Sequence, residues 1–233
     1  MIRNLKVLLL AALAVAAFGA LNATGAQAAE EFHCSVNPCR FRLNPDGTGT
    51  TSHHVFVIHN SAAESASVTC KKLTGEGTLA ALASTDVTLT NLAYSECNIS
   101  GEPADVEMNG CEYTFTSANG APGNATGAQV HVLCSGAKHI EIKVTNAAKE
   151  VLCTFEVTPQ TATGIRYTNI TSKTEVTATA NTTALAVENT GGTKAKCLLD
   201  PTKTPLTGNY TTGNTIITGE TDPGEVMASA WWE

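Results

Sequence analysis

Residues 151–157, Val-Leu-Cys-Thr-Phe-Glu-Val, decide the fold class of this chain. Cys153 and the apolar residues two positions away alternate with Thr154 and Glu156. A period of two residues is typical of a β-strand that buries one side and leaves the other in water. Because the cysteine lies in phase with the apolar side, the stretch also indicates a disulfide inside a β core.

Outward from this stretch, the same alternation recurs along the chain. It occurs at 66–70, 111–116, 129–134 and 139–144, and further strands are expected at 54–59, 86–92, 164–169, 174–180, 184–188, 194–199, 209–218 and 226–232. Turn-forming pairs such as Asn109-Gly110 separate these segments, and threonine, which suits the wet side of a strand, is frequent. We therefore expect an all-β fold with an antiparallel, Ig-like β-sandwich architecture. It forms one large or two small packed units, with a candidate boundary near 118–127.

The eight cysteines are expected to form structural disulfides. Four of them lie in phase with the apolar side of a predicted strand: Cys70, Cys111, Cys134 and Cys153. Eight cysteines allow 105 pairings, and the sequence alone does not choose among them. Order and loop length favour the pairs Cys34–Cys39, Cys70–Cys97, Cys111–Cys134 and Cys153–Cys197. No C-x-x-C motif is present, so disulfides are favoured over a zinc site or a redox-active pair.

The first 28 residues have the three parts of a cleavable signal peptide. Arg3 and Lys6 precede the apolar run 7–21, and the small-x-small triplet Ala26-Gln27-Ala28 follows it. The run is shorter than the roughly 20 residues that a membrane-spanning helix needs. We therefore expect cleavage after Ala28, a secreted all-β region at 29–233, and no transmembrane segment after cleavage. Disulfides agree with an oxidising extracellular or cell-surface location.

Charge and motifs exclude several functional classes. The chain has 14 basic and 21 acidic residues and a net charge of −7. Binding to nucleic acid or to anionic lipid needs clustered Lys and Arg, so neither partner is expected. The motifs G-x-S-x-G and H-E-x-x-H are missing from the sequence, as are glycine-rich phosphate loops. No catalytic residue, cofactor or metal is assigned.

A few polar and aromatic residues are candidates for weaker roles. His53 and His54 point to opposite sides of a strand and are interpreted as residues at its start. A hairpin of 128–134 with 138–144 would place His131 opposite Glu141, as an ordinary cross-strand pair. Residues 44–48, Asn-Pro-Asp-Gly-Thr, are interpreted as a turn and not as a calcium loop, which needs a downstream acid. Carboxylates able to form a glycosidase pair are Asp86, Glu96, Asp105, Glu107 and Glu112.

Several stretches together resemble a group of known proteins. They include His54-Val55-Phe56, Val68-Thr69-Cys70-Lys71, Tyr94-Ser95-Glu96-Cys97, Met108-Asn109-Gly110-Cys111-Glu112-Tyr113, Cys153-Thr154-Phe155-Glu156-Val157 and Gly208-Asn209-Tyr210-Thr211. With them, most of the region after the signal is similar to uncharacterised secreted, disulfide-containing β-proteins of actinobacteria. The Cys34–Cys39 pair is an addition to that pattern. The resemblance implies a secreted β fold and no assigned activity, so no functional residue is carried over.

Three functions remain open at this point. The first is a non-catalytic secreted or cell-surface protein that binds an extracellular partner, a glycan or matrix, with Trp231-Trp232 as candidate contact residues. Core or edge-strand packing is the favoured interpretation for at least one of these tryptophans. The second is an extracellular polysaccharide hydrolase that uses a carboxylate pair. The third is a secreted inhibitor or toxin-like module that presents the loop 34–39.

Overall fold

Apart from Cys197, which has helical geometry, all regular secondary structure that the structure describes is in strands. This structure is a computed structural model, and it describes residues 31–44, 53–116, 125–170, 175–193, 197–200, 202–221, 227–228 and 230–232. The signal peptide expected at 1–28 lies outside these residues. Within them, no helix has the length and apolar character needed to cross a membrane.

Sixteen strands follow one another along the described chain. Their bounds are β1 Phe32–Cys34, β2 Cys39–Asn44, β3 His54–His59, β4 Ser65–Leu79, β5 Ala83–Ser84, β6 Asp86–Ile99, β7 Glu102–Glu107, β8 Glu112–Thr116, β9 Ala125–Leu133, β10 Ile140–Thr145, β11 Val151–Val157, β12 Gln160–Asn169, β13 Glu175–Gly192, β14 Leu206–Glu220, β15 Met227–Ala228 and β16 Ala230–Trp232. Every strand pairing is antiparallel, which is the all-β, sandwich-like class expected from the alternation.

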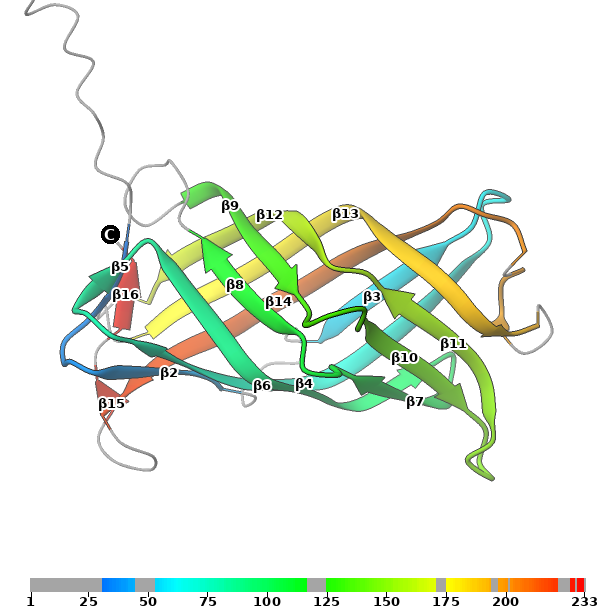
Figure 1. Ribbon diagram of the computed structural model, residues 1–233, viewed down its shortest axis with the longest axis horizontal. Helices are drawn as coiled ribbons and strands as arrows, with labels where there is room; N and C mark the ends of the chain where they lie inside the picture. The colour runs from blue at the N-terminus through cyan, green and yellow to red at the C-terminus, as the bar shows by residue number, and fades with distance from the viewer. Residues whose placement is uncertain are drawn as a thin grey trace, which may run out of the picture.

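Four long strands, β4, β6, β13 and β14, run through the length of the main sheet (Figure 1). Towards one end, the sheet between them is completed by β2, β8, β9 and β12, and towards the other end by β3, β7, β10 and β11. Further pairings of β11 with β13, β6 with β4 and β14 with β3 join the ends of this path. The sheet therefore closes on itself, and its inward side chains form a continuous apolar core.

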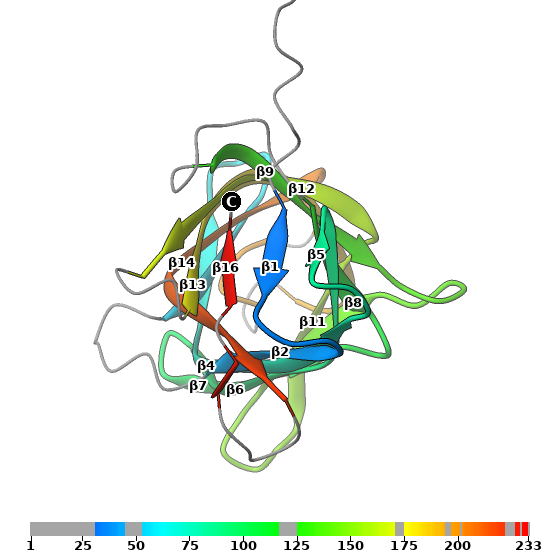
Figure 2. The same cartoon turned by 90° about the vertical axis from the view of Figure 1, so that its left-hand side faces the viewer.

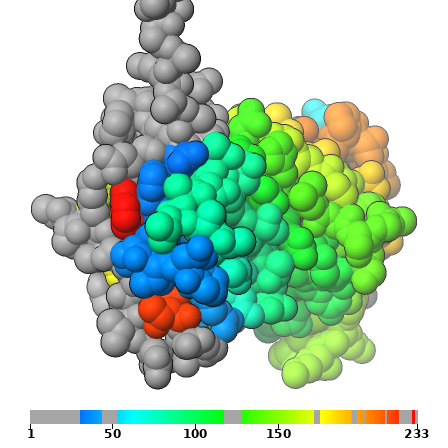
Figure 3. Space-filling view, turned by 60° about the vertical axis from the view of Figure 1, so that its left-hand side comes forward, coloured from blue at the N-terminus to red at the C-terminus, as the bar shows by residue number. Residues whose placement is uncertain are grey.

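A small second sheet, in the order β16-β1-β5, lies across one end of the main sheet (Figure 2). The space-filling view of Figure 3 shows the N-terminal strands in blue beside the C-terminal β16 in red. Phe32 of β1 is fully buried there and packs edge-on against Phe41 and Tyr167 of the main sheet. This end of the interior is therefore filled by aromatic rings.

The opposite end carries residues 197–200, which belong to no strand. Leu199 and Cys197 are buried, and the Cys153–Cys197 disulfide fixes the segment to β11. The backbone N–H of Asp200 donates to Glu64 at 2.7 Å, and the Asn60 side chain donates to the Asp200 carbonyl at 3.1 Å. The prediction of a strand over 194–199 is therefore wrong for its described residues: Cys197 is helical, with its N–H donating to the Thr193 carbonyl at 2.8 Å, and 198–199 form a bend.

All eight cysteines are in disulfides. The pairs are Cys34–Cys39, Cys70–Cys97, Cys111–Cys134 and Cys153–Cys197, the same pairs that order and loop length favour. Cys70 and Cys97 face each other directly in the register of β4 and β6. Four buried or half-buried disulfides agree with a protein made for an oxidising compartment.

The deciding stretch 151–157 forms β11, but its alternation is interrupted. Register shifts occur between Val144 and Thr145 in β10 and between Thr154 and Phe155 in β11. As a result three successive residues, 153–155, are buried, and Val151 is 52% exposed although the simple period places it inside. Irregularities of this kind bend a strand, which a sheet needs in order to close on itself.

Strands before and after 118–127 belong to the same sheet. β8 pairs directly with β9 from Glu112↔Leu133 to Thr116↔Gln129. The main sheet therefore continues across the candidate boundary. Residues 118–124 themselves lie outside the described part, as do 45–48 of the expected turn after β2.

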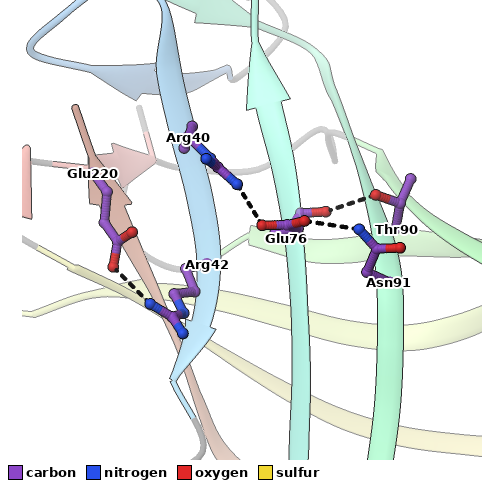
Figure 4. A network of polar contacts seen from close by, with 6 residues as sticks. All are labelled: Arg40, Arg42, Glu76, Thr90, Asn91 and Glu220. Carbon is purple, nitrogen blue, oxygen red and sulfur yellow. Dashed lines mark hydrogen bonds and ion pairs between the residues drawn. The ribbon is translucent and has the colours of Figure 1, made fainter. Parts of the chain in front are cut away.

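A polar network on the outer side links β2, β4, β6 and β14 (Figure 4). Arg40 forms an ion pair with Glu76, and the Asn91 side chain donates to the same carboxylate at 2.7 Å. Arg42 forms a longer pair, 3.5 Å, with Glu220. The hydrogen bond from Asn91 and the guanidinium of Arg40 lower the pKa of Glu76. These exposed contacts add little stability, and they favour the strand register that the interior requires.

Candidate functional site

A cavity of about 120 Å³ lies inside the main sheet, between the aromatic end and the 197–200 end. Side chains from both groups of short strands and from all four long strands line it. Apolar residues form most of its wall, among them Val68, Leu73, Val106, Val132, Ile142 and Ile165. The volume resembles that of apolar protein cavities that take up a benzene-sized molecule. No Asp, Glu, Lys or Arg is among the described residues on this wall.

One histidine and three tyrosines form the polar part of the wall. His54 begins β3, in phase with Phe56 and Ile58, so the burial pattern of the strand turns it inward. Tyr94 comes from β6, Tyr113 from β8 and Tyr210 from β14. The four side chains start on four different strands and meet only because the sheet closes.

Their polar atoms form a chain of hydrogen bonds. His54 Nδ1 lies 2.6 Å from the Tyr210 hydroxyl, and the Tyr94 hydroxyl donates to the Tyr210 oxygen at 3.4 Å. The Tyr113 and Tyr94 hydroxyls are 3.1 Å apart. The His54 ring also packs edge-on against Tyr94, with ring centroids 5.6 Å apart. We call these four residues the His–Tyr cluster.

Proton counting fixes the direction of this chain. Each phenol has one proton, and that of Tyr94 goes to Tyr210. In the arrangement that uses all three phenol protons, Tyr113 donates to Tyr94, and Tyr210 donates to His54 Nδ1. A neutral imidazole that accepts at Nδ1 carries its proton at Nε2. The geometry thus selects the Nε2–H tautomer of His54.

The His54 Nε2–H has no hydrogen-bond partner among the described residues. His54 is only 5% exposed, so bulk water does not solvate this donor either. A buried donor without a partner costs about 1–3 kcal/mol. A molecule inside the cavity with an acceptor oxygen or nitrogen is able to remove that cost.

The His–Tyr cluster is uncharged over the physiological pH range. Burial, together with the charge of the neighbouring His53, lowers the pKa of His54 to about 4. Burial also raises the pKa of Tyr94, Tyr113 and Tyr210 well above its usual range. Both effects have the same cause, since a charged form loses its hydration inside the apolar interior.

The three cluster tyrosines face open space inside the molecule. Protein surrounds each of them, yet each keeps accessible surface, unlike Tyr167 at the filled end. Gly208 leaves room for the Phe56 ring on the cavity wall, because a Cβ at position 208 would lie 2.5 Å from that ring. Three of the four wall threonines bond to protein, with Thr182 donating to the Thr163 carbonyl and Thr212 bonded to Thr215.

A second, shallower depression lies on the outer side, between Lys138, His139, Glu141 and Glu156. Its carboxylates are already paired: His139 Nδ1 is 2.6 Å from Glu156, and Lys143 Nζ is 3.1 Å from Glu141. Glu141 and Glu156 are direct neighbours on adjacent strands and not on opposite walls of a groove. This arrangement is a paired sheet surface, and it lacks the converging acids that glycoside hydrolysis needs.

The other sequence candidates lie away from the cavity. Glu96 pairs with Lys72 at 2.8 Å and Glu107 with Lys143 at 2.7 Å, both on the surface. The remaining acids of that set, Asp86, Asp105 and Glu112, also stay outside the cavity wall. Within the described part of the chain, no group of three or more His, Cys, Asp or Glu side chains is placed to hold a metal.

The expected hairpin that pairs His131 with Glu141 is wrong. β9 pairs with β8 and β12, so His131 faces Thr114 and Thr161, and its Nδ1 lies 2.8 Å from the Thr161 hydroxyl. β10 instead pairs with β7 and β11 in the other half of the sheet. The chain crosses between the two halves after β9, which adjacent alternating segments do not reveal.

The terminal candidates gather at the small sheet. Trp231 of β16 is half-buried and stacks on His33 of β1, with ring centroids 5.3 Å apart and planes 7° apart. Trp232 faces Phe32 in the strand register. In the 34–39 loop, Val36 packs against the core, whereas Ser35, Asn37 and Pro38 are exposed.

Sequence reasoning missed the His–Tyr cluster. The sequence interpretation of His54 is a residue at the start of a strand, and the alternation over 111–116 places Tyr113 on the side of Cys111 and Phe115. Inward phase is a usable signal for both, because a polar side chain on an apolar strand face needs an interior partner.

Comparison of the chain with protein-family models, curated proteins and solved structures finds no significant match.

Proposed function

We propose that this chain is a non-catalytic binding protein that holds a small, uncharged, mainly apolar molecule in its interior cavity. The observation that carries the proposal is the cavity itself: about 120 Å³, with apolar walls and one polar cluster. Binding sites for small molecules combine these two features, since apolar walls supply affinity and a few polar groups fix orientation. The small volume restricts the ligand to roughly the size of one six-membered ring.

Charge supports the restriction to neutral ligands. No ionic side chain is among the described residues on the wall, and the His–Tyr cluster is neutral near pH 7. A carboxylate or ammonium group inside the cavity would lose its hydration without gaining a counter-ion. Catalysis is not part of the proposal, because the described wall offers no carboxylate, no cysteine thiol and no cationic group to act on a bound molecule.

Access requires a local opening of the structure. The small sheet closes one end with few pairings, three residue pairs between β1 and β16 and two between β1 and β5. Regions with few backbone pairings open at lower free energy than the rest of a fold. We place ligand access at this end, where β1 and β16 must move together because Phe32 of β1 packs against Phe41 and Tyr167.

The proposed location is outside the cytoplasm, by secretion. The N-terminal 28 residues have the composition of a signal peptide, and four disulfides suit an oxidising compartment. The resemblance to secreted actinobacterial β-proteins agrees with this location and leaves the ligand open. We therefore place the binding activity in the extracellular or cell-surface space.

The test is binding of a matched neutral and charged pair to the oxidised chain, followed by calorimetry and by NMR of methyl groups. We expect methylenecyclohexane to bind and to shift methyl signals of the cavity wall, and cyclohexylammonium to leave them unchanged. Ala162→Leu, which adds bulk to the wall, should weaken binding at least about tenfold. His131→Gln on the outer side of the adjacent strand is the control. Equal binding of both ligands, or unchanged affinity in Ala162→Leu, would contradict the proposal.

A further inference from the structure

The unpartnered His54 Nε2–H makes the cavity selective and not merely apolar. Three observations concern this donor. The His54 side chain is only 5% exposed, and it lies on the cavity wall. Its Nε2–H has no hydrogen-bond partner among the described residues. Native proteins rarely leave such a donor unpaired. The missing partner must therefore be something that occupies the cavity.

The required partner is a hydrogen-bond acceptor. We propose that the ligand carries a neutral acceptor group, of the ketone or ether class, which receives the hydrogen bond of His54 Nε2–H while the rest of the molecule packs against the apolar wall. This inference rests on the proposed function, because it names the chemical class that the cavity selects. His54 is then the specificity-determining residue of the site.

Tyr210 is the positioning residue for this donor. Its hydroxyl accepts from Tyr94, and His54 Nδ1, 2.6 Å away, is the acceptor within reach of its own proton. The donor and acceptor sides of the imidazole are thereby fixed before a ligand arrives. A preorganised donor discriminates against ligands that lack an acceptor, because such ligands leave Nε2–H unpaired.

The geometry also explains why water alone does not satisfy the site equally well. A buried water typically makes about three hydrogen bonds to polar groups, and the described wall offers few groups that are not already bonded to one another. A ketone needs only one donor for its oxygen and matches the apolar wall elsewhere. The cavity therefore suits a molecule with a single acceptor better than a cluster of waters.

The test compares two ligands of nearly equal shape, cyclohexanone and methylenecyclohexane, which differ by C=O against C=CH₂. The measured quantity is the ratio of their dissociation constants in the oxidised chain and in two variants. His54→Gln places an amide donor near the position of Nε2 and should keep the ratio. His54→Asn is shorter, bonds only towards Tyr210, and should reduce the preference for the ketone about 3- to 10-fold.

The outcomes separate the two proposals. If methylenecyclohexane binds and the ratio is the same in all three proteins, the acceptor inference is wrong while the binding function stands. If neither ligand binds the parent chain, both proposals are wrong. Should His54→Asn fail to fold, Tyr210→Phe takes its place. Without the Tyr210 hydroxyl, no donor keeps the proton of His54 on Nε2, so the ketone preference should also fall.

An NMR measurement tests the inference without any variant. The ¹⁵N shifts of the imidazole report which ring nitrogen carries the proton. We expect His54 to carry it at Nε2, and the Nε2 resonance to shift when cyclohexanone binds but not when methylenecyclohexane binds. A proton on Nδ1 in the free protein would overturn the inference, since Nε2 would then be an acceptor.

Discussion

Two regions of the same closed sheet differ in how completely side chains fill their interior. At the end under the small sheet, Phe32, Phe41 and Tyr167 fill the space with fully buried rings. In the middle, His54 and the cluster tyrosines face a cavity of about 120 Å³. Both regions use inward-pointing aromatic side chains on antiparallel strands. The difference therefore does not come from the type of secondary structure.

The filled end differs because it receives a side chain from outside the main sheet. Phe32 belongs to β1, and its ring centroid lies 5.1 Å from that of Tyr167. Close strand approach helps as well, since a Cβ at Gly77 would meet the Thr88 carbonyl oxygen at 2.3 Å. The middle has no such insertion among the described residues. A hollow interior reduces stability, because the side chains around it lose packing contacts.

The largest expected difference concerns truncation of a phenylalanine in each region. Phe32→Ala should leave a dry hole between packed rings and cost about 5 kcal/mol, whereas Phe56→Ala should cost about 3 kcal/mol. The second value is lower because the removed ring borders space that is already open, which reduces the cavity contribution. Urea unfolding of both variants gives the two free energies. Equal losses would show that the two regions do not differ in packing.

Acid sensitivity should come from the hollow region. His54 has a pKa of about 4 in the folded protein, against its ordinary value of 6.5 when unfolded. Protons therefore bind the unfolded chain more tightly than the folded one over this interval. The contribution of His54 to stability is complete above pH 6.5 and is lost as the pH falls towards 4, by about 3 kcal/mol in all.

The matched pair for this pH dependence is His54→Gln and His131→Gln. The free energy of unfolding is measured by urea titration between pH 4 and pH 7.5. His54→Gln should lose most of the slope below pH 6.5, although His53 and the surface carboxylates still titrate. His131→Gln, on the outer side, should keep the slope of the parent chain. If His54→Gln retains the full slope, then burial of His54 is not the source of acid sensitivity.

Local phase predicted much of the fold, and long-range closure supplied the site. Cys70, Cys111 and Cys153 lie inward as their alternation predicts, because strand phase is a local property. The bond between His54 and Tyr210 joins residues 156 positions apart, and it depends on β3 and β14 being neighbours. Sequence periodicity contains no information on which distant strands pair.

The crossing between the two halves is the clearest failure of local reasoning. Consecutive alternating segments usually form a hairpin, and on that basis β9 and β10 were expected to pair. They occupy different halves of the sheet, with β8 and β12 beside β9, and β7 and β11 beside β10. The cavity volume could not be predicted either. It is the small difference between the space that the closed sheet encloses and the summed volume of inward side chains from many strands.

The smallest expected effect comes from replacing each of two buried alanines with valine, which adds two methyl groups to the Cβ atom. Ala128, on β9, is fully buried and does not line the cavity, whereas Ala162, on β12, is on the cavity wall. Ala128→Val should destabilise the fold by about 1–3 kcal/mol through overpacking. Ala162→Val should be neutral or stabilise it by up to about 1 kcal/mol, because its methyl groups enter open space.

Thermal and urea unfolding of the two valine variants measure this difference directly. Both changes place a β-branched residue in a strand, so strand propensity shifts in the same direction and cancels in the comparison. What remains is the space beside each Cβ. A larger loss for Ala162→Val than for Ala128→Val would mean that the cavity wall is tightly packed in solution. Since ligand binding requires that space, the same result would also argue against an interior binding site.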